Sequence, residues 1–322
     1  MHSVTVPLEP LLAYALVVDP HLLPGLADHA ATDARDRALT LLRIYDLHTA
    51  PLEAIGAAAQ FQGHPAVAAI KSRLEAEWLT GLEAGWAQEQ ELTGLSTAAG
   101  AVAGMRAVAA RDRLPQAYRW LASEATWAEL VDFLALEGGP DGGFDDLVAA
   151  CQIGLHGSAK LELAKNFWDE MGNGDPAAVH TVLHQRLVAA LAMPQRARAE
   201  QSLATLERAA LTGLLATNRY LQPELIGALG LLELQAGPRC RLVLAAFDRL
   251  GAPAEAYPFY LEHAEVDPIH GKDWTEKAIA PLVAEHPHWG PRIVKGAWWR
   301  STVNLAFFRA VQDEVLAAAQ AA

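Results

Sequence analysis

The most informative stretch of the chain is His263-Ala264-Glu265-Val266-Asp267-Pro268-Ile269-His270. Its two histidines and its aspartate stand at positions i, i+4 and i+7, which share one face of an α-helix. Leu261, Ala264 and Ile269 are apolar neighbours, so we expect this helix to face inward. Two imidazoles and a carboxylate are ligand types of iron, manganese or zinc. A hydrogen-bonded cluster at the surface or in the core is the alternative interpretation.

The sequence around this stretch favours helix throughout. Ala, Leu, Glu and Arg recur at helical spacing, and the Ala-rich segments 65–85 and 201–215 favour helix by intrinsic propensity. Alternating runs of Val, Ile and Thr between turn pairs, which mark strands, are not found. The nearest strand candidate, residues 241–246, fits a helix equally well. We therefore predict an all-α protein.

Glycine and proline clusters divide this helical sequence into segments. The sharpest break is Glu137-Gly138-Gly139-Pro140-Asp141-Gly142-Gly143. Pro223 predicts a helix start near residue 222, since proline is tolerated in the first turn. Residues 251–253 predict a helix end, and residues 286–291 a break between the last two helices. The first ~110 residues carry no distinctive chemistry and are interpreted as helical packing or a separate lobe.

A second group of candidate ligands flanks a glycine-rich break. Glu170 closes one helical stretch, and His180 follows ten residues later, beyond Gly172-Asn173-Gly174. Regular helical spacing does not bring these two side chains together, but an interrupted helix can. The alternative is a solvated helix end, which is a common setting for an acidic pair before a glycine turn.

Glu233 is the third candidate ligand. It follows eight uncharged residues, Leu225 to Leu232, in a nearly apolar helix. A carboxylate in such a place is costly unless it is paired or bound to a metal. A partnered core glutamate, or a glutamate on the one exposed face of the helix, remains the alternative.

These residues in their order resemble the haem-oxygenase-like di-iron oxidases and oxygenases, often called iron-containing redox enzymes. The resemblance covers roughly residues 115–315. It rests on Glu170 with His180 ten residues later, on the Gly-Ala-Leu-Gly-Leu-Leu-Glu helix that ends at Glu233, and on the His-x3-Asp-x2-His stretch. The segment 160–174, Lys-Leu-Glu-Leu-Ala-Lys-Asn-Phe-Trp-Asp-Glu-Met-Gly-Asn-Gly, is similar to the first metal-binding helix of the family.

The resemblance implies an architecture and a ligand set. Residues 116–322 would form a seven-helix haem-oxygenase-like bundle, with residues 1–115 as an additional helical region packed on it. A further carboxylate found in some members would correspond to Glu137 or Asp146. From proximity in sequence, Asp169, Glu262 or Glu265 could accept hydrogen bonds from the ligand imidazoles. The implied metal ligands are Glu170, His180, Glu233, His263, Asp267 and His270.

The resemblance also implies an activity. Members bind two iron ions per chain, use O2 as co-substrate and oxidise a small molecule, by N-oxygenation or oxidative C–C cleavage of an amino acid, amine or fatty acid. An electron donor, not identified by the sequence, would restore the ferrous state, and a homodimer is expected from the habits of the fold. Within this activity, a mononuclear site of His263, His270 and one carboxylate is an alternative to two irons. Two further alternatives are metal-independent enzymes of related fold, of the quinone-cofactor oxidase or thiamin-salvage type, and a non-catalytic helical interaction protein.

Charge and cysteine content limit the partners and the cellular compartment that we expect. The 322 residues carry 25 Lys and Arg against 38 Asp and Glu, a net charge of −13 that disfavours nucleic acid and anionic membranes as partners. Two cysteines, Cys151 and Cys240, are too few for a disulfide-rich fold or a cysteine metal cluster. No stretch approaches the roughly 18 to 20 apolar residues of a transmembrane helix. A soluble enzyme of the reducing cytoplasm is expected.

Overall fold

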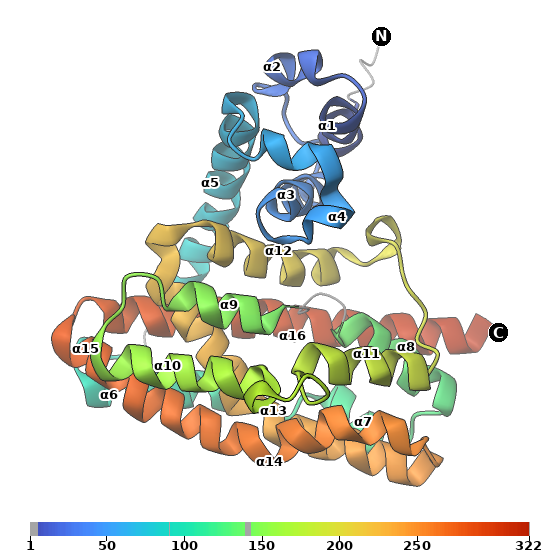
Figure 1. Cartoon of the computed structure of the whole chain (residues 1–322), viewed down its shortest axis with the longest axis vertical. Coiled ribbons are helices and arrows are strands. Elements are labelled where there is room, and N and C mark those ends of the chain that lie inside the picture. Colours follow the sequence, from blue (N-terminus) through green and yellow to red (C-terminus); the bar gives the residue numbers. More distant parts are fainter. Residues whose placement is uncertain (1–5, 90, 139–142, 322) are drawn as a thin grey trace. The chain divides into compact units, whose positions relative to one another are not determined.

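Every element of the structure is a helix. A computed structural model describes residues 6–89, 91–138 and 143–321, with side chains up to residue 316 (Figure 1). No strand is assigned within these ranges, and residues 241–246 lie inside a helix. The prediction of an all-α protein is confirmed. Most of the predicted break at 138–143 falls on residues 139–142, outside the described residues.

The chain divides into two compact units, Met1–Glu89 with Ala197–Arg219, and Gln90–Arg196 with Tyr220–Ala322. These ranges differ in two places from the expected division at residue 115. Helix α6 (Ala98–Arg111) belongs to the second unit, and helix α12 (Leu203–Thr217) belongs to the first. An independent N-terminal domain that packs on the bundle stays a prediction.

The first unit is organised by buried carboxylates that hold its helices together. Its elements are α1 (Leu8–Val17), η1 (Pro20–Leu22), α2 (Leu23–Leu26), α3 (Ala34–Thr49), α4 (Leu52–Ile55), η2 (Gly56–Phe61), α5 (Pro65–Ala87), η5 (Arg198–Glu200) and α12. Asp36 accepts the backbone N–H of Leu8 at 2.8 Å and so caps α1 from α3. Glu75 accepts the Tyr45 hydroxyl at 2.9 Å, which ties α5 to α3. These contacts satisfy groups that would be costly to bury unpaired.

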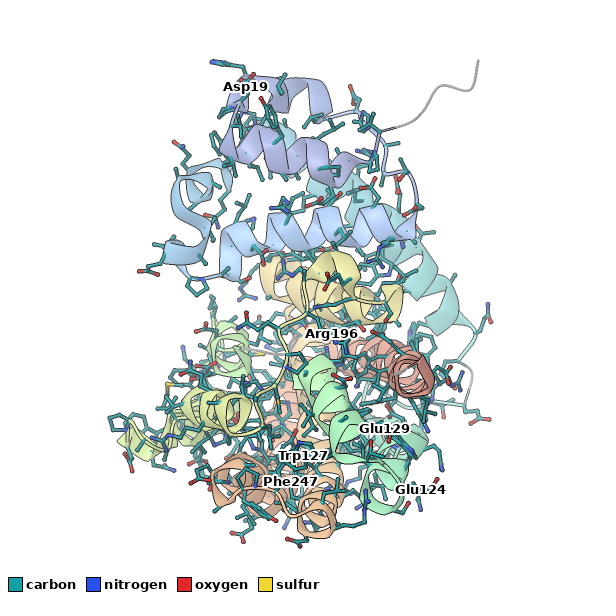
Figure 2. The ribbon with its side chains drawn as sticks, turned by 90° about the vertical axis from the view of Figure 1, so that its right-hand side faces the viewer. Asp19, Glu124, Trp127, Glu129, Arg196 and Phe247 are labelled. Atoms are coloured by element: carbon teal, nitrogen blue, oxygen red, sulfur yellow. The ribbon has the colours of Figure 1, made fainter. Side chains whose placement is uncertain are left out.

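The second unit is built around α13 (Gln222–Leu250), the helix that carries Glu233, which packs against α14 (Tyr257–Asp273) and α16 (Trp289–Ala321). Phe247 of α13, labelled in Figure 2, is fully buried, and its ring makes edge contacts with the rings of Tyr257 and Tyr260. Its other elements are α6, α7 (Gln116–Ser123), α8 (Trp127–Gly138), α9 (Phe144–Cys151), α10 (Gly157–Glu170), η4 (Gly172–Gly174), α11 (His180–Ala190), η7 (Ala254–Ala256), the π-helix η8 (Trp274–Ile279) and α15 (Ala280–Glu285). The short helix η6 (Arg219–Leu221) begins at the last residue of the first unit and continues into the second. No described helix is long and apolar enough to cross a membrane.

Helix boundaries follow the signals in the sequence. Helix α13 begins at Gln222 with Pro223 in its first turn, and Gly251 ends it with φ +70°. Helix α15 ends at Glu285 and α16 begins at Trp289, as the break at 286–291 predicts. At the start of α8, Thr126 N–H donates to Glu129 Oε2 at 2.7 Å, a contact of the capping-box type. Local chemistry therefore sets where these helices begin and end.

Close approach of α13 and α14 depends on Gly271. A Cβ on this residue would come within 2.8 Å of the Glu233 carbonyl oxygen and 3.0 Å of the Leu234 Cα. Both contacts are with backbone, which cannot turn away as a flexible side chain can. Gly271 therefore lets the helix with His270 lie directly against the helix with Glu233.

Replacing Gly271 with alanine should lower the free energy of unfolding by about 1–3 kcal/mol, because the two helices must move apart. Urea denaturation of the variant checks this. Gly81 is the control: it lies in helix α5 with open space around its Cβ position. Gly81→Ala should instead stabilise by about 0.5–1 kcal/mol through helix propensity. Equal behaviour of the two variants would contradict the packing argument.

Candidate metal centre

Four helices of the second unit bring the six predicted ligand residues to one region. Glu170 ends α10, His180 begins α11, Glu233 lies within α13, and α14 carries the other three. All are buried except His263, which is partly exposed. Two groups of side chains have possible ligand atoms within 4.8 Å of one another, Glu170–His180–His263 and Glu170–Glu233–His270. Glu170 belongs to both.

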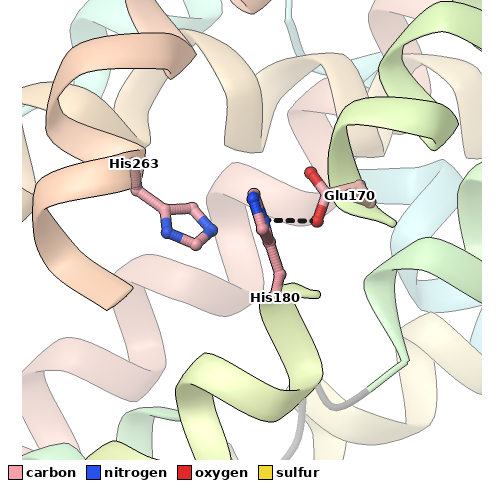
Figure 3. Close-up of side chains that lie close together, drawn as sticks. All are labelled: Glu170, His180 and His263. Carbon is pink, nitrogen blue, oxygen red and sulfur yellow. Dashed lines mark ion pairs between the residues drawn. The ribbon is translucent and has the colours of Figure 1, made fainter. Parts of the chain in front are cut away.

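A glycine turn returns the chain from Glu170 to His180. Gly172, Asn173 and Gly174 all have positive φ, at 61°, 53° and 89°. A Cβ on Gly172 would lie 2.5 Å from the Ala178 carbonyl carbon, so only glycine fits where the chain folds back. His180 Nδ1 consequently lies 2.7 Å from Glu170 Oε2 (Figure 3). The interrupted helix expected from the sequence brings these two residues together.

His263 completes the first group. Its ring centroid lies 4.6 Å from that of His180, and Figure 3 shows the two rings close to the Glu170 carboxylate. His263 Nδ1 lies 2.6 Å from the Phe259 carbonyl oxygen one turn earlier. Since a carbonyl only accepts, Nδ1 carries the proton and Nε2 is the nitrogen left for a ligand.

His270 is the centre of the second group. Its Nδ1 lies 3.6 Å from Glu233 Oε2 and 3.9 Å from Asp267 Oδ1. Its Nε2 lies 3.0 Å from Asp169 Oδ2. Of the three acidic residues expected to support the imidazoles, Asp169 makes this contact, whereas Glu262 and Glu265 are exposed on α14. Asp267 is buried beside this group rather than within it.

The structure corrects the expected environment of α14. Ala264 is buried, but Leu261 and Ile269 are 43% and 57% exposed. The inward face carries the polar residues Asp267 and His270, whereas the large apolar side chains of Leu261 and Ile269 lie outside. The i, i+4, i+7 spacing indicated the correct face, and the apolar neighbours did not.

The two weaker carboxylate candidates lie outside both groups. Glu137, in the last turn of α8, accepts the Tyr118 hydroxyl at 2.9 Å. Asp146 is exposed in the first turn of α9, next to Asp145. A role for either of them as a ligand stays a prediction.

The three histidines differ in how their surroundings shift their pKa values. Burial, helped by neighbouring His180, lowers the pKa of His263 to about 4, which keeps this imidazole neutral. Burial also acts to lower the pKa of His270, but Glu233 and Asp169 outweigh it and raise that pKa to about 9. At His180 burial is likewise outweighed, here mainly by Glu170, and the pKa is raised. A proton on His270 therefore offsets part of the negative charge of Glu233 and Asp169.

The carboxylates show how crowded with negative charge the region is. Burial, and then Glu233 and Glu170, raise the pKa of Asp267 well above its ordinary value. Buried acids in such numbers need protons or cations for neutralisation. Among the described residues, the Nδ1 atoms of His180 and His270 are buried without a hydrogen bond, although each lies close to a carboxylate. Nitrogen and oxygen donors that converge without satisfying one another fit a metal ion.

Sequence reasoning missed Asn166. It is buried on α10, one turn before Glu170, and its Nδ2 donates to Glu233 Oε1 at 2.9 Å. Its only signal in the sequence is helical spacing, since positions i and i+4 share a face. No residue near Asn166 in the sequence indicates that its partner lies 67 positions later.

A fold of this kind with such a ligand set is typical of iron enzymes built on helical bundles. Residues 131–304, more than half of the chain, match the sequence family described as "iron-containing redox enzyme", of the haem-oxygenase-like type. The protein belongs to this family, as the resemblance indicated. No curated protein matches the chain.

Proposed function

We propose that the protein is an O2-dependent, non-haem di-iron oxidase or oxygenase that acts on a small molecule. Membership of the iron-containing redox family supports a redox enzyme that uses iron. The proposal of two iron ions rests on one observation, the two ligand groups that share Glu170. A carboxylate has two oxygens and can bridge two ions, so one buried glutamate can serve both positions.

The distribution of histidines favours two iron positions over one. A mononuclear site built from His263, His270 and one carboxylate would need these two histidines in one group, but His263 groups with His180, and His270 groups with Glu233. Glu170, His180 and His263 alone have the ligand types of a one-iron site, so it is the second group, Glu170–Glu233–His270, that supports a second iron position. Each proposed position then has at least one imidazole and shares the Glu170 carboxylate.

The residues of the chain have defined tasks in this proposal. Bound iron would supply the redox chemistry with O2 that the family uses. Neutral His263 is ready to bind without losing a proton, whereas His270 and Asp267 must each release one when a metal arrives. The second unit would hold this centre dry and in place, as the burial of five of the six residues indicates.

Anaerobic loading with Fe(II) tests the proposal. We expect two iron ions per chain, and exposure to O2 in a stopped-flow spectrometer should give a transient visible absorption. One tightly bound iron would favour a mononuclear enzyme. An absence of specific uptake would refute the metal centre and favour the metal-independent enzyme or the interaction protein. Added haemin should give no stable complex, since the site offers converging ligands for bare ions.

The proposal also covers the substrate class, the compartment and the oligomeric state. Amino acids, amines and fatty acids are the classes to screen for O2 consumption, with an external electron donor. A cytoplasmic enzyme, and a homodimer, remain parts of the proposal. Both cysteines are free and buried, which supports a reducing compartment.

A further inference from the structure

Residues on one face of α10 contact the second ligand group, Glu170–Glu233–His270. Asn166, Asp169 and Glu170 stand at i, i+3 and i+4 and so lie on adjoining parts of that face. Glu170 is a proposed ligand, whereas the other two touch ligands on α13 and α14. We propose that Asn166 and Asp169 are positioning residues that fix Glu233 and His270 in the orientation that accepts the metal. This inference rests on the proposed function and deepens it.

Asp169 determines which nitrogen of His270 is available. Its carboxylate accepts the Nε2 proton at 3.0 Å, so Nδ1 is the nitrogen that can lose its proton to a metal. Nδ1 is also the atom that faces Glu233 and Asp267, at 3.6 and 3.9 Å. A carboxylate behind a ligating imidazole fixes the ring and raises its basicity. Asp169 is 20% exposed and His270 is 3% exposed, so the contact closes the outer side of the group.

Asn166 determines which carboxylate oxygen of Glu233 is available. Its Nδ2 occupies Glu233 Oε1, and Oε2 is left facing His270 Nδ1. Because a carboxylate only accepts, the amide nitrogen rather than the amide oxygen must face it. Asn166 is buried, so without this bond Oε1 would be left unsatisfied and the side chain free to turn.

If Asn166 and Asp169 only held the helices together, removing another tie between the same helices would weaken metal binding as much. The same two helices are also joined by Lys165 of α10 and Asp273 of α14, whose Nζ and Oδ2 atoms lie 3.6 Å apart. Asp273 is buried, like the ligands, and its ion pairs among the described residues are with Lys165 and Lys277 rather than with any of the six proposed ligands. Asp273→Asn therefore removes a tie between α10 and α14 without removing support from a ligand.

The experiment measures metal affinity. Wild type, Asp169→Asn, Asp169→Ala, Asn166→Ala and Asp273→Asn are titrated anaerobically with Fe(II) against a chromophoric chelator. Loss of an outer-shell partner costs roughly 10- to 100-fold in metal affinity. We expect Asp169→Ala near the upper end, and Asp169→Asn near the lower end because its amide oxygen still accepts the Nε2 proton. Asn166→Ala should fall in the same range, and Asp273→Asn should bind like wild type.

A spectroscopic readout separates positioning from stability. In the Co(II)-loaded protein, the exchangeable ring N–H of His270 should give a strongly shifted proton resonance, identified by its loss in His270→Ala. Asp169→Asn should keep this resonance, and Asp169→Ala should lose it to solvent exchange. Circular dichroism of the metal-free variants establishes that each is folded.

Three outcomes would overturn the inference. Unchanged affinity in Asp169→Ala and Asn166→Ala, with two irons in wild type, would refute it and leave the proposed function standing. An equal loss in Asp273→Asn would show that helix tethering, not ligand orientation, is responsible. Wild type without iron uptake would refute the proposed function and this inference with it.

Discussion

Glu170→Ala is expected to leave the protein without bound iron. Glu170 is shared by both ligand groups, so its removal takes a ligand from each position at once. His263→Ala removes a ligand from one group only and should retain iron at the Glu233–His270 position. Removal of Glu170 also relieves repulsion on Asp267, so the metal-free variant should fold. Iron per chain after anaerobic loading and desalting measures the difference.

Three further variants complete this prediction. Asp267→Ala should lose at least one iron, because Asp267 is buried 3.9 Å from His270 Nδ1. Glu265→Ala is the matched control, an exposed carboxylate on the same helix as three of the ligands. His48→Ala, in helix α3 of the first unit, should also leave the iron content unchanged. Two irons retained in Glu170→Ala would remove the basis for a shared ligand.

Helical periodicity explains what could be predicted of this site. His263, Asp267 and His270 lie on one helix, so spacing alone places them on one face. Glu233 was identified by the cost of a carboxylate in an apolar helix, and it is indeed buried. The glycine break between Glu170 and His180 indicated an interruption, although its direction depends on three consecutive residues with positive φ.

Contacts between distant segments explain what could not be predicted. The partners of Asn166 and Asp169 lie 67 and 101 residues away, and sequence spacing carries no information at that range. The inclusion of α12 in the first unit is of the same kind, since its partner α3 lies early in the chain. The exposed side chains of Leu261 and Ile269 show a further limit, because a buried polar face reverses the usual link between hydrophobicity and burial.

Asp267→Asn should make the metal-free protein more stable than wild type, increasingly so as pH rises. Burial and the neighbouring glutamates raise the pKa of Asp267 well above its ordinary value. Above about pH 4 the unfolded chain releases this proton, whereas the folded protein still holds it. Wild type therefore loses up to about 1.4 kcal/mol of stability per pH unit until the folded pKa is reached. The amide imitates the protonated acid and does not titrate, so this loss is absent from the variant.

Urea denaturation of chelator-treated proteins between pH 5 and 8 measures this effect as the difference between variant and wild type. His270, whose pKa is raised to about 9, is present in both proteins, and its stabilising contribution is complete below its unfolded pKa of about 6.5 and declines from there to about pH 9 in both. Saturating Fe(II) should reverse the order, because a ligand at 100 times its Kd stabilises the folded state by about 2.7 kcal/mol. Wild type should gain this stabilisation and Asp267→Asn should lose much of it, since an amide neutralises no metal charge. A difference between the metal-free proteins that does not change with pH would show that Asp267 is ionised in the folded state, and would contradict the crowded carboxylate site that metal binding is proposed to neutralise.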